Sequence, residues 1–137
     1  MNKKRILAVD DDATALGALR QMLTQRGYDV TLAANGEEAL QRIEEQTPDL
    51  IILDVAMPGL SGFETCRLIR EAPRTRRTPI IFLTAKGLLT DMAEGQEAGS
   101  DLYLIKPVLA TKLIATVGMF LAPDVAAHRA SPQAVKG

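Results

Sequence analysis

The chain is poor in several residue types, and each scarcity excludes a class of protein. Its 137 residues include one cysteine, one histidine and no tryptophan. The single cysteine, Cys66, excludes an internal disulfide and is typical of a reducing compartment. The basic start of the chain leads into only four apolar residues, at 6–9, which is too short for a secretory signal. Together these features favour a cytoplasmic protein.

Long apolar runs and an excess of charge are missing too. No apolar run approaches the length of a membrane span, and 16 basic residues balance 17 acidic ones. This balance demands neither a nucleic acid nor a membrane as a partner. Arginine is concentrated between residues 67 and 77, but no aromatic residue is interleaved there. We interpret this segment as a solvated loop, with an acidic partner surface as the alternative; its arginines are Arg67, Arg70, Arg74, Arg76 and Arg77.

What the chain does contain is a regular alternation of two patterns. Five short apolar runs, typical of buried strands, begin 22, 22, 30 and 22 residues apart, and each gap leaves room for one helix. The runs occupy residues 6–9, 28–32, 50–53, 80–83 and 102–105. This alternation predicts an α/β fold, a doubly wound (βα)5 parallel sheet with helices on both faces. We expect the domain to span residues 1–122, with a flexible tail or linker stub at 123–137.

Capping signals mark most of the expected helices. The first helix covers residues 13–26 and is stopped by Gly27. The second and third begin after Asn35 and Ser61, each followed three residues later by a glutamate that completes a capping box. The fourth begins near Asp91, and the fifth covers residues 110–121.

Polar residues follow four of the five predicted strands. Three aspartates stand at 10–12, Asp54 ends the third strand, Thr84 the fourth and Lys106 the fifth. The carboxyl ends of parallel strands share one edge of a sheet, which is where ligands bind in such folds. Clustered carboxylates repel one another, and a divalent cation such as Mg²⁺ relieves that repulsion. With a lysine and a hydroxyl beside them, they suit phosphoryl transfer to a carboxylate.

Four motifs carry a resemblance to a known family: ILAVDDD at 6–12, LIILDVAMPGLSG at 50–62, IIFLTA at 80–85 and YLIKP at 103–107. In this order and spacing the sequence resembles the receiver domain of two-component response regulators over about residues 3–121. The resemblance implies a flavodoxin-like strand order 2-1-3-4-5. It also implies a signalling module rather than a true enzyme, phosphorylated with Mg²⁺ by a histidine kinase or a histidine phosphotransfer protein.

The resemblance also implies a role for individual residues at the site. Asp54 would be the phosphoacceptor and a metal ligand. Asp11 would bind Mg²⁺ directly, Asp10 would hold a metal-bound water, and the backbone carbonyl of Ala56 would be a further ligand. Asp12 has no implied role, and we expect it to cap the first helix.

A second group of residues would respond to phosphorylation. Thr84 would be the switch hydroxyl, Lys106 the phosphate-contacting cation and Tyr103 the switch aromatic. Ala56 and Lys86, two residues beyond Asp54 and Thr84, would set how fast the acyl phosphate is hydrolysed. The sequence departs from the family pattern at Ser61 and Val108, where an acidic and an aromatic residue are common.

The expected partners follow from the same reading. The only histidine, His128, lies in the tail, so a partner must supply the phosphoryl group. Lys112 is the only charge between Lys106 and Asp124, so even the outward side of the fifth helix is mildly apolar. We expect the surface of the fourth helix, fifth strand and fifth helix to bind a downstream protein or a second copy. We expect no direct contact with nucleic acid and none with a membrane.

Two other functions remain open at this point. Residues 10–14 fit D-x-D-x-T, the nucleophile motif of haloacid-dehalogenase-type phosphatases, in which Asp10 would be phosphorylated instead of Asp54. Those enzymes need a further acidic pair after the lysine, and here only Asp124 follows. A degenerate receiver that never takes phosphate is the third possibility. The sequence could also be an isolated domain of a longer polypeptide.

Overall fold

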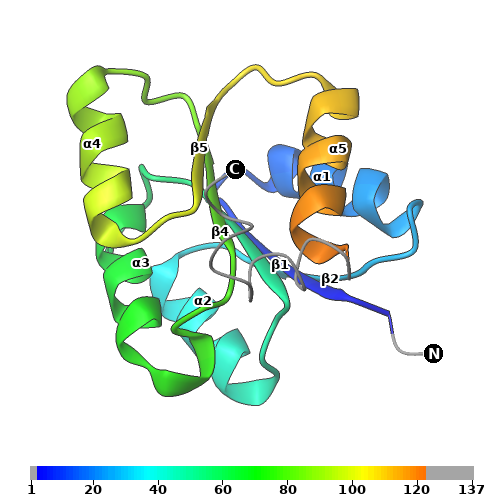
Figure 1. The fold of residues 1–137 in the computed structure, drawn as a ribbon, viewed down its shortest axis with the longest axis horizontal. Coiled ribbons are helices and arrows are strands. Elements are labelled where there is room, and N and C mark those ends of the chain that lie inside the picture. Colours follow the sequence, from blue (N-terminus) through cyan, green and yellow to red (C-terminus); the bar gives the residue numbers. More distant parts are fainter. Residues whose placement is uncertain (1–2, 123–137) are drawn as a thin grey trace, which may run out of the picture.

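The computed structural model describes residues 3–122 as one five-stranded parallel sheet between two layers of helices (Figure 1). The strand order is β2-β1-β3-β4-β5, which confirms the predicted fold class and order. The strands are β1 Arg5–Val9, β2 Asp29–Ala33, β3 Leu50–Leu53, β4 Ile80–Thr84 and β5 Leu102–Ile105. The helices are α1 Ala13–Thr24, α2 Gly36–Glu45, α3 Gly62–Glu71, α4 Leu89–Ala98 and α5 Ala110–Leu121, with a short 3₁₀ turn at Pro73–Thr75.

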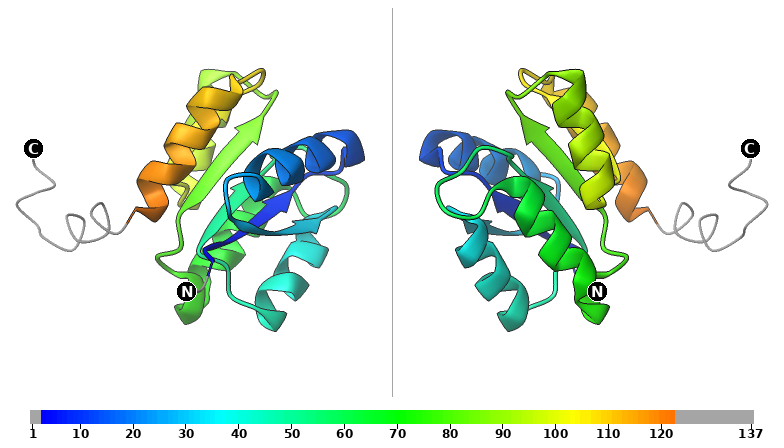
Figure 2. Two further views of the ribbon diagram at one scale, coloured as in Figure 1. Left: turned by 90° about the vertical axis from the view of Figure 1, so that its right-hand side faces the viewer. Right: turned by 90° about the vertical axis from the view of Figure 1, so that its left-hand side faces the viewer.

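The central strands are continuous apolar runs because helices cover both of their faces. On one face α2, α3 and α4 pack around Phe82, Leu53 and Ile69. On the other face α1 and α5 pack around Ile81, Leu23 and Val117 (Figure 2). The residues that follow the strands therefore stand together at one end of a sheet whose central strands β3 and β4 are buried throughout.

Side-chain caps fix where the helices around that edge begin. The Asp12 carboxylate accepts hydrogen bonds from the amides of Thr14 and Ala15 at 2.9 and 3.3 Å, which confirms it as the cap of α1. Ser61 and Glu64 form the predicted reciprocal capping box of α3. In α2 the Asn35 side chain accepts from the amide of Glu38, as a capping box requires. The Glu38 carboxylate, however, accepts from the amide of Ala34 and not from that of Asn35.

Two expectations about helix ends need correction. Helix α4 begins at Leu89, not near Asp91, because the Asp91 carboxylate caps the amide of Leu88 from inside the first turn. Helix α1 ends at Thr24, two residues early, and Gly27 follows with a φ of 91°.

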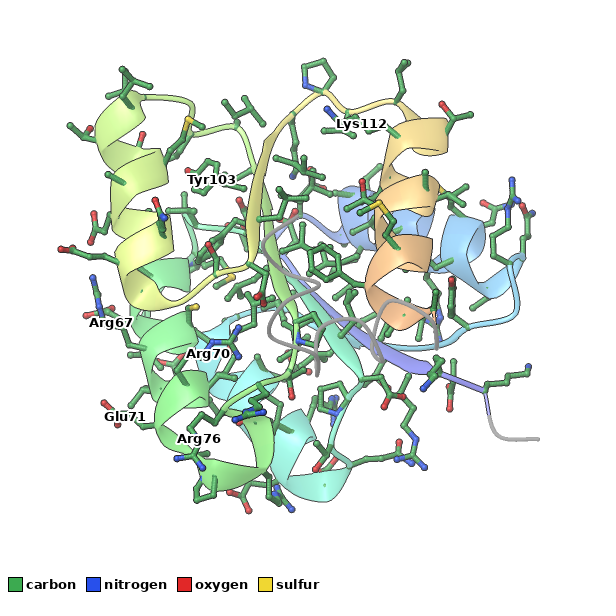
Figure 3. The ribbon with its side chains drawn as sticks, viewed as in Figure 1. Arg67, Arg70, Glu71, Arg76, Tyr103 and Lys112 are labelled. Carbon is green, nitrogen blue, oxygen red and sulfur yellow. The ribbon has the colours of Figure 1, made fainter. Side chains whose placement is uncertain are left out.

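The interpretation of the arginine segment as solvated is wrong for Arg70. Its guanidinium donates to the carbonyl of Gly99 at 2.8 Å and to that of Thr78 at 2.6 Å, and it pairs with Asp101 at 2.9 Å. Only 18% of its side chain is exposed. Figure 3 shows Arg70 on α3, near the turn that leads into β4.

The expected tail at 123–137, including His128 and Asp124, lies outside the described residues. In residues 3–122, none of the helices has both the length and the apolar character that crossing a membrane requires.

Candidate functional site

Three carboxylates meet where β1 and β3 end. The two strands are neighbours in the sheet, and Val9 lies opposite Leu53. Asp10 and Asp11 follow β1, and Asp54 follows β3, so one oxygen from each carboxylate lies within 4.8 Å of the others. Three hard oxygen ligands at this separation fit a divalent cation such as Mg²⁺. The sequence prediction that these residues come together is therefore confirmed.

Asp54 is held in place and mostly shielded from solvent. Its side chain accepts a hydrogen bond from the amide of Val55 at 2.8 Å, and 8% of the residue is exposed. Burial raises the pKa of the Asp54 carboxyl; a hydrogen bond from Thr84 lowers it, and the charge of Asp10 raises it further. An ionised Asp54 is thus costly in the unliganded site, and a bound cation offsets that cost.

Lys106 reaches the same carboxylates from β5, the strand at one edge of the sheet. β5 is separated from β1 by β3 and β4, yet the Lys106 ammonium donates to the second carboxylate oxygen of Asp10 at 2.9 Å. The first oxygen of Asp10 accepts from the amide of Asp12 at 3.0 Å. Burial alone would lower the pKa of Lys106, but the hydrogen bond to Asp10 and its charge raise it, so the lysine stays cationic.

Thr84 and Tyr103 both contact the loop between β4 and α4. The buried Thr84 hydroxyl accepts from the amide of Lys86 at 3.3 Å, and as a neighbour of Asp54 it lowers the pKa of that carboxyl. The Tyr103 hydroxyl donates to the carbonyl of Lys86 at 2.7 Å. The structure thus connects Thr84, beside Asp54, to Tyr103 through the backbone amide and carbonyl of Lys86.

The remaining predicted residues surround this arrangement. Ala56 is exposed in the loop that follows Asp54, and the Lys86 side chain is exposed beside Thr84. The sequence analysis assigned Lys86 a role through its side chain only. Its backbone contacts were missed because no residue pattern reports which carbonyl a tyrosine will reach.

Gly62 is a second residue that the sequence analysis missed. Its amide donates to the carbonyl of Val55 at 2.8 Å, and a Cβ at this position would collide with the carbonyl of Asp54. Only glycine therefore lets α3 begin this close to the loop that carries the site. The glycine beside the Ser61 cap was a visible signal, but its reason is tertiary.

Comparisons with known proteins agree with this geometry. The sequence matches the family model described as response regulator receiver domain over residues 6–118. It is 48% identical over 103 residues to the transcriptional regulatory protein AfsQ1 of Streptomyces coelicolor, covering 75% of this chain and 44% of that protein. The chain spans about half the length of the curated relatives it matches.

Solved structures show the same fold. Chemotaxis protein CheY4 of Vibrio cholerae superposes with a TM-score of 0.83 at 33% identity, covering 88% of this chain and all of that one. The receiver domain of the sensor histidine kinase PA1611 of Pseudomonas aeruginosa superposes with a TM-score of 0.80 at 35% identity, covering 87% and 98% of the two chains. That structure has a magnesium ion coordinated in its active-site cleft.

Proposed function

The chain belongs to the response regulator receiver family, and from this premise we propose that Asp54 is the residue that accepts the phosphoryl group. Receivers are signalling domains driven by phosphorylation with Mg²⁺, and the acidic cluster of this chain fits that ion. The observation that carries the proposal is the different engagement of the two buried aspartates. Lys106 and the amide of Asp12 each bind one oxygen of Asp10, whereas the groups next to the Asp54 carboxylate, the Val55 amide and the Thr84 hydroxyl, are uncharged.

The reaction is a transfer from a phosphohistidine of a partner kinase. One carboxylate oxygen of Asp54 attacks phosphorus, an O–P bond forms, and the N–P bond breaks with its electron pair returning to the imidazole. When bound, Mg²⁺ neutralises the phosphoryl oxygens in the transition state. We assign Asp10, Asp11, Asp54 and the carbonyl of Ala56 to holding that ion.

Protein groups complete the phosphoryl site. Lys106 supplies a compact positive charge to one phosphoryl oxygen, and the Thr84 hydroxyl donates to another. Once Thr84 turns to the phosphoryl group, its bond to the Lys86 amide changes, and Tyr103 responds through the Lys86 carbonyl. We expect the exposed side chains of Ala56 and Lys86 to set the access of water to the acyl phosphate.

Partner binding is the output of this switch. The phosphoryl donor is a histidine kinase or a histidine phosphotransfer protein. The surface of α4, β5 and α5 exposes Leu89, Ile105 and Met119, which supports docking of a downstream protein or a second copy there. The buried, free Cys66 supports a cytoplasmic location.

Intact-mass measurement with a small acyl-phosphate donor and Mg²⁺ tests the acceptor. Wild type should gain ~80 Da, the mass of one phosphoryl group on a covalent nucleophile. Asp54→Asn should gain nothing. Asp29→Asn removes an exposed carboxylate at the amino end of β2, away from the site, and should behave as wild type.

The modified residue can also be identified directly. Borohydride reduces an aspartyl phosphate to homoserine, so peptide mapping then marks the acceptor. Homoserine at 54 would support the proposal, whereas homoserine at 10 would refute it in favour of the phosphatase-type nucleophile.

A further inference from the structure

Helix α4 is anchored differently from the other described helices. Its buried residues are only Gly95 and Ala98, whereas α1, α2, α3 and α5 each bury at least one large aliphatic side chain. Glycine inside a helix costs about 1 kcal/mol relative to alanine. A buried glycine in the middle of α4 therefore calls for a packing reason.

The aromatic rings of β4 and β5 provide that reason. Tyr103 and Phe82 are paired in register, with ring centroids 5.6 Å apart. A Cβ at Gly95 would lie 2.8 Å from Cδ2 and 3.1 Å from Cε2 of Tyr103, and 3.3 Å from Cδ2 of Phe82. The missing side chain of Gly95 thus leaves the space in which the Tyr103 ring lies, between α4 and β5 (Figure 3).

The ring position matters because of what the hydroxyl at its end contacts. Tyr103 donates to the Lys86 carbonyl at 2.7 Å, and the Lys86 amide donates to Thr84 at 3.3 Å. Thr84 ends β4, the strand beside β3, so its hydroxyl stands next to Asp54 at the ends of the two strands. A shift of the ring away from α4 would break the first of these bonds and release the loop that orients Thr84.

We propose that Gly95 is a positioning residue for the phosphoryl site: it seats the Tyr103 ring against α4 and so holds Thr84 toward Asp54 through Lys86. The inference rests on the proposed function for its effect on phosphorylation. Its structural part, the seating of the ring and of the Lys86 peptide, holds independently of any phosphoryl group.

The test compares two helical glycines, Gly95 with side chains close to its Cα and Gly118 with open space around it. Gly95→Ala places a methyl group against the Tyr103 ring, whereas the methyl group of Gly118→Ala on α5 would have no atom within 4 Å. The affinity for beryllium trifluoride in the presence of Mg²⁺ is measured by NMR titration of the backbone amide signals. It should fall about fivefold in Gly95→Ala, as expected for the loss of one hydrogen bond. Gly118→Ala should bind as wild type.

A double-mutant cycle separates the ring from a general effect on the helix. In a Tyr103→Ala background, Gly95→Ala should cause no further loss, because the ring it displaces is gone. Tyr103→Phe keeps the ring in its seat and deletes only the bond to Lys86, so it should lose as much affinity as Gly95→Ala. An equal loss from Gly95→Ala with and without the ring would overturn the proposal.

The remaining outcomes also decide. If Gly95→Ala does not fold, the Gly95→Ala/Tyr103→Ala variant should fold, and failure of both would overturn the proposal. If wild type binds no beryllium trifluoride, the proposed function fails. The inference about Gly95 is then tested by the NMR signals of the Tyr103 ring and of the Lys86 amide. They should shift in Gly95→Ala and not in Gly118→Ala; unchanged signals would refute it.

Discussion

The two ends of the sheet use the same charged residue types in opposite ways. At the amino ends of the strands, Asp49 accepts from the amide of Arg5 at 2.8 Å, and Asp101 accepts from the amide of Ile80 and from Arg70, both at 2.9 Å. At the carboxyl ends, Asp10, Asp11 and Asp54 crowd within 4.8 Å of one another. Asp11 is exposed, and its carboxylate forms no ion pair within residues 3–122.

The difference teaches that an acid's role depends on what its oxygens contact. Asp49 and Asp101 at the amino ends are matched by donors that the fold itself supplies, so they stabilise the folded chain. The carboxylates at the carboxyl ends lie close enough to repel one another. Binding a cation relieves this repulsion, and the site can then accept a phosphoryl group. Such a site is maintained at a cost in stability, as is common where function requires it.

The largest effect is expected at the amino ends, from Arg70→Met. The change removes donors to the carbonyls of Gly99 and Thr78 and the ion pair between Arg70 and Asp101. We expect a loss of about 3 kcal/mol in the free energy of unfolding, measured by urea titration. Arg76→Met, a change at an exposed arginine nearby, should stay within about 0.5 kcal/mol. Equal losses would mean that the Arg70 network does not stabilise this edge.

Arg70 also shows where sequence reasoning stops. Two of its partners, Gly99 and Asp101, lie 29 and 31 residues away, and four of its acceptors are backbone carbonyls, which every residue carries. No spacing rule selects such acceptors, so an arginine in a charged run was assigned to solvent. The start of α4 was misplaced for a similar reason, since the cap of Leu88 comes from within the helix.

The carboxyl ends were far easier to predict. A strand buried on both faces is a readable apolar run, and the residue after it must stand at the sheet edge. Asp10, Asp54, Thr84 and Lys106 were placed this way. Gly62 and Gly95 were not, because their roles depend on backbone and rings that approach them from other elements.

A smaller effect concerns pH at the amino-end network. Burial raises the pKa of the Cys66 thiol to about 11 from its ordinary 9.0, while Arg70 lowers it and Asp101 raises it. The folded chain therefore keeps a proton that the unfolded chain releases, so stability is lost as pH rises from 9.0 to about 11. We expect a loss of about 2 kcal/mol over this range.

Cys66→Ala provides the comparison for that slope. The variant should show a shallower decline between the same pH values, since the thiol no longer titrates, and the difference between the two curves isolates this group. Parallel curves would show that the thiol is not shielded by its position.

The smallest effect compares one aspartate from each edge directly. Asp54→Asn removes a carboxyl group whose pKa is raised by burial. Without Mg²⁺ the substitution should therefore stabilise the chain by about 1 kcal/mol. Asp101→Asn removes the negative charge that pairs with Arg70 and should destabilise the chain by about 1 kcal/mol. Urea titrations in the presence of a chelator measure both.

Magnesium should then change only one side of this comparison. Because Mg²⁺ binds the folded site, it should stabilise wild type and Asp101→Asn, by about 2.7 kcal/mol at a hundred times its Kd. Asp54→Asn lacks one ligand charge and should gain less, so its advantage over wild type should disappear. If Asp54→Asn is destabilising in chelator, the carboxyl-end cluster is not under repulsion, and the contrast between the two edges is lost.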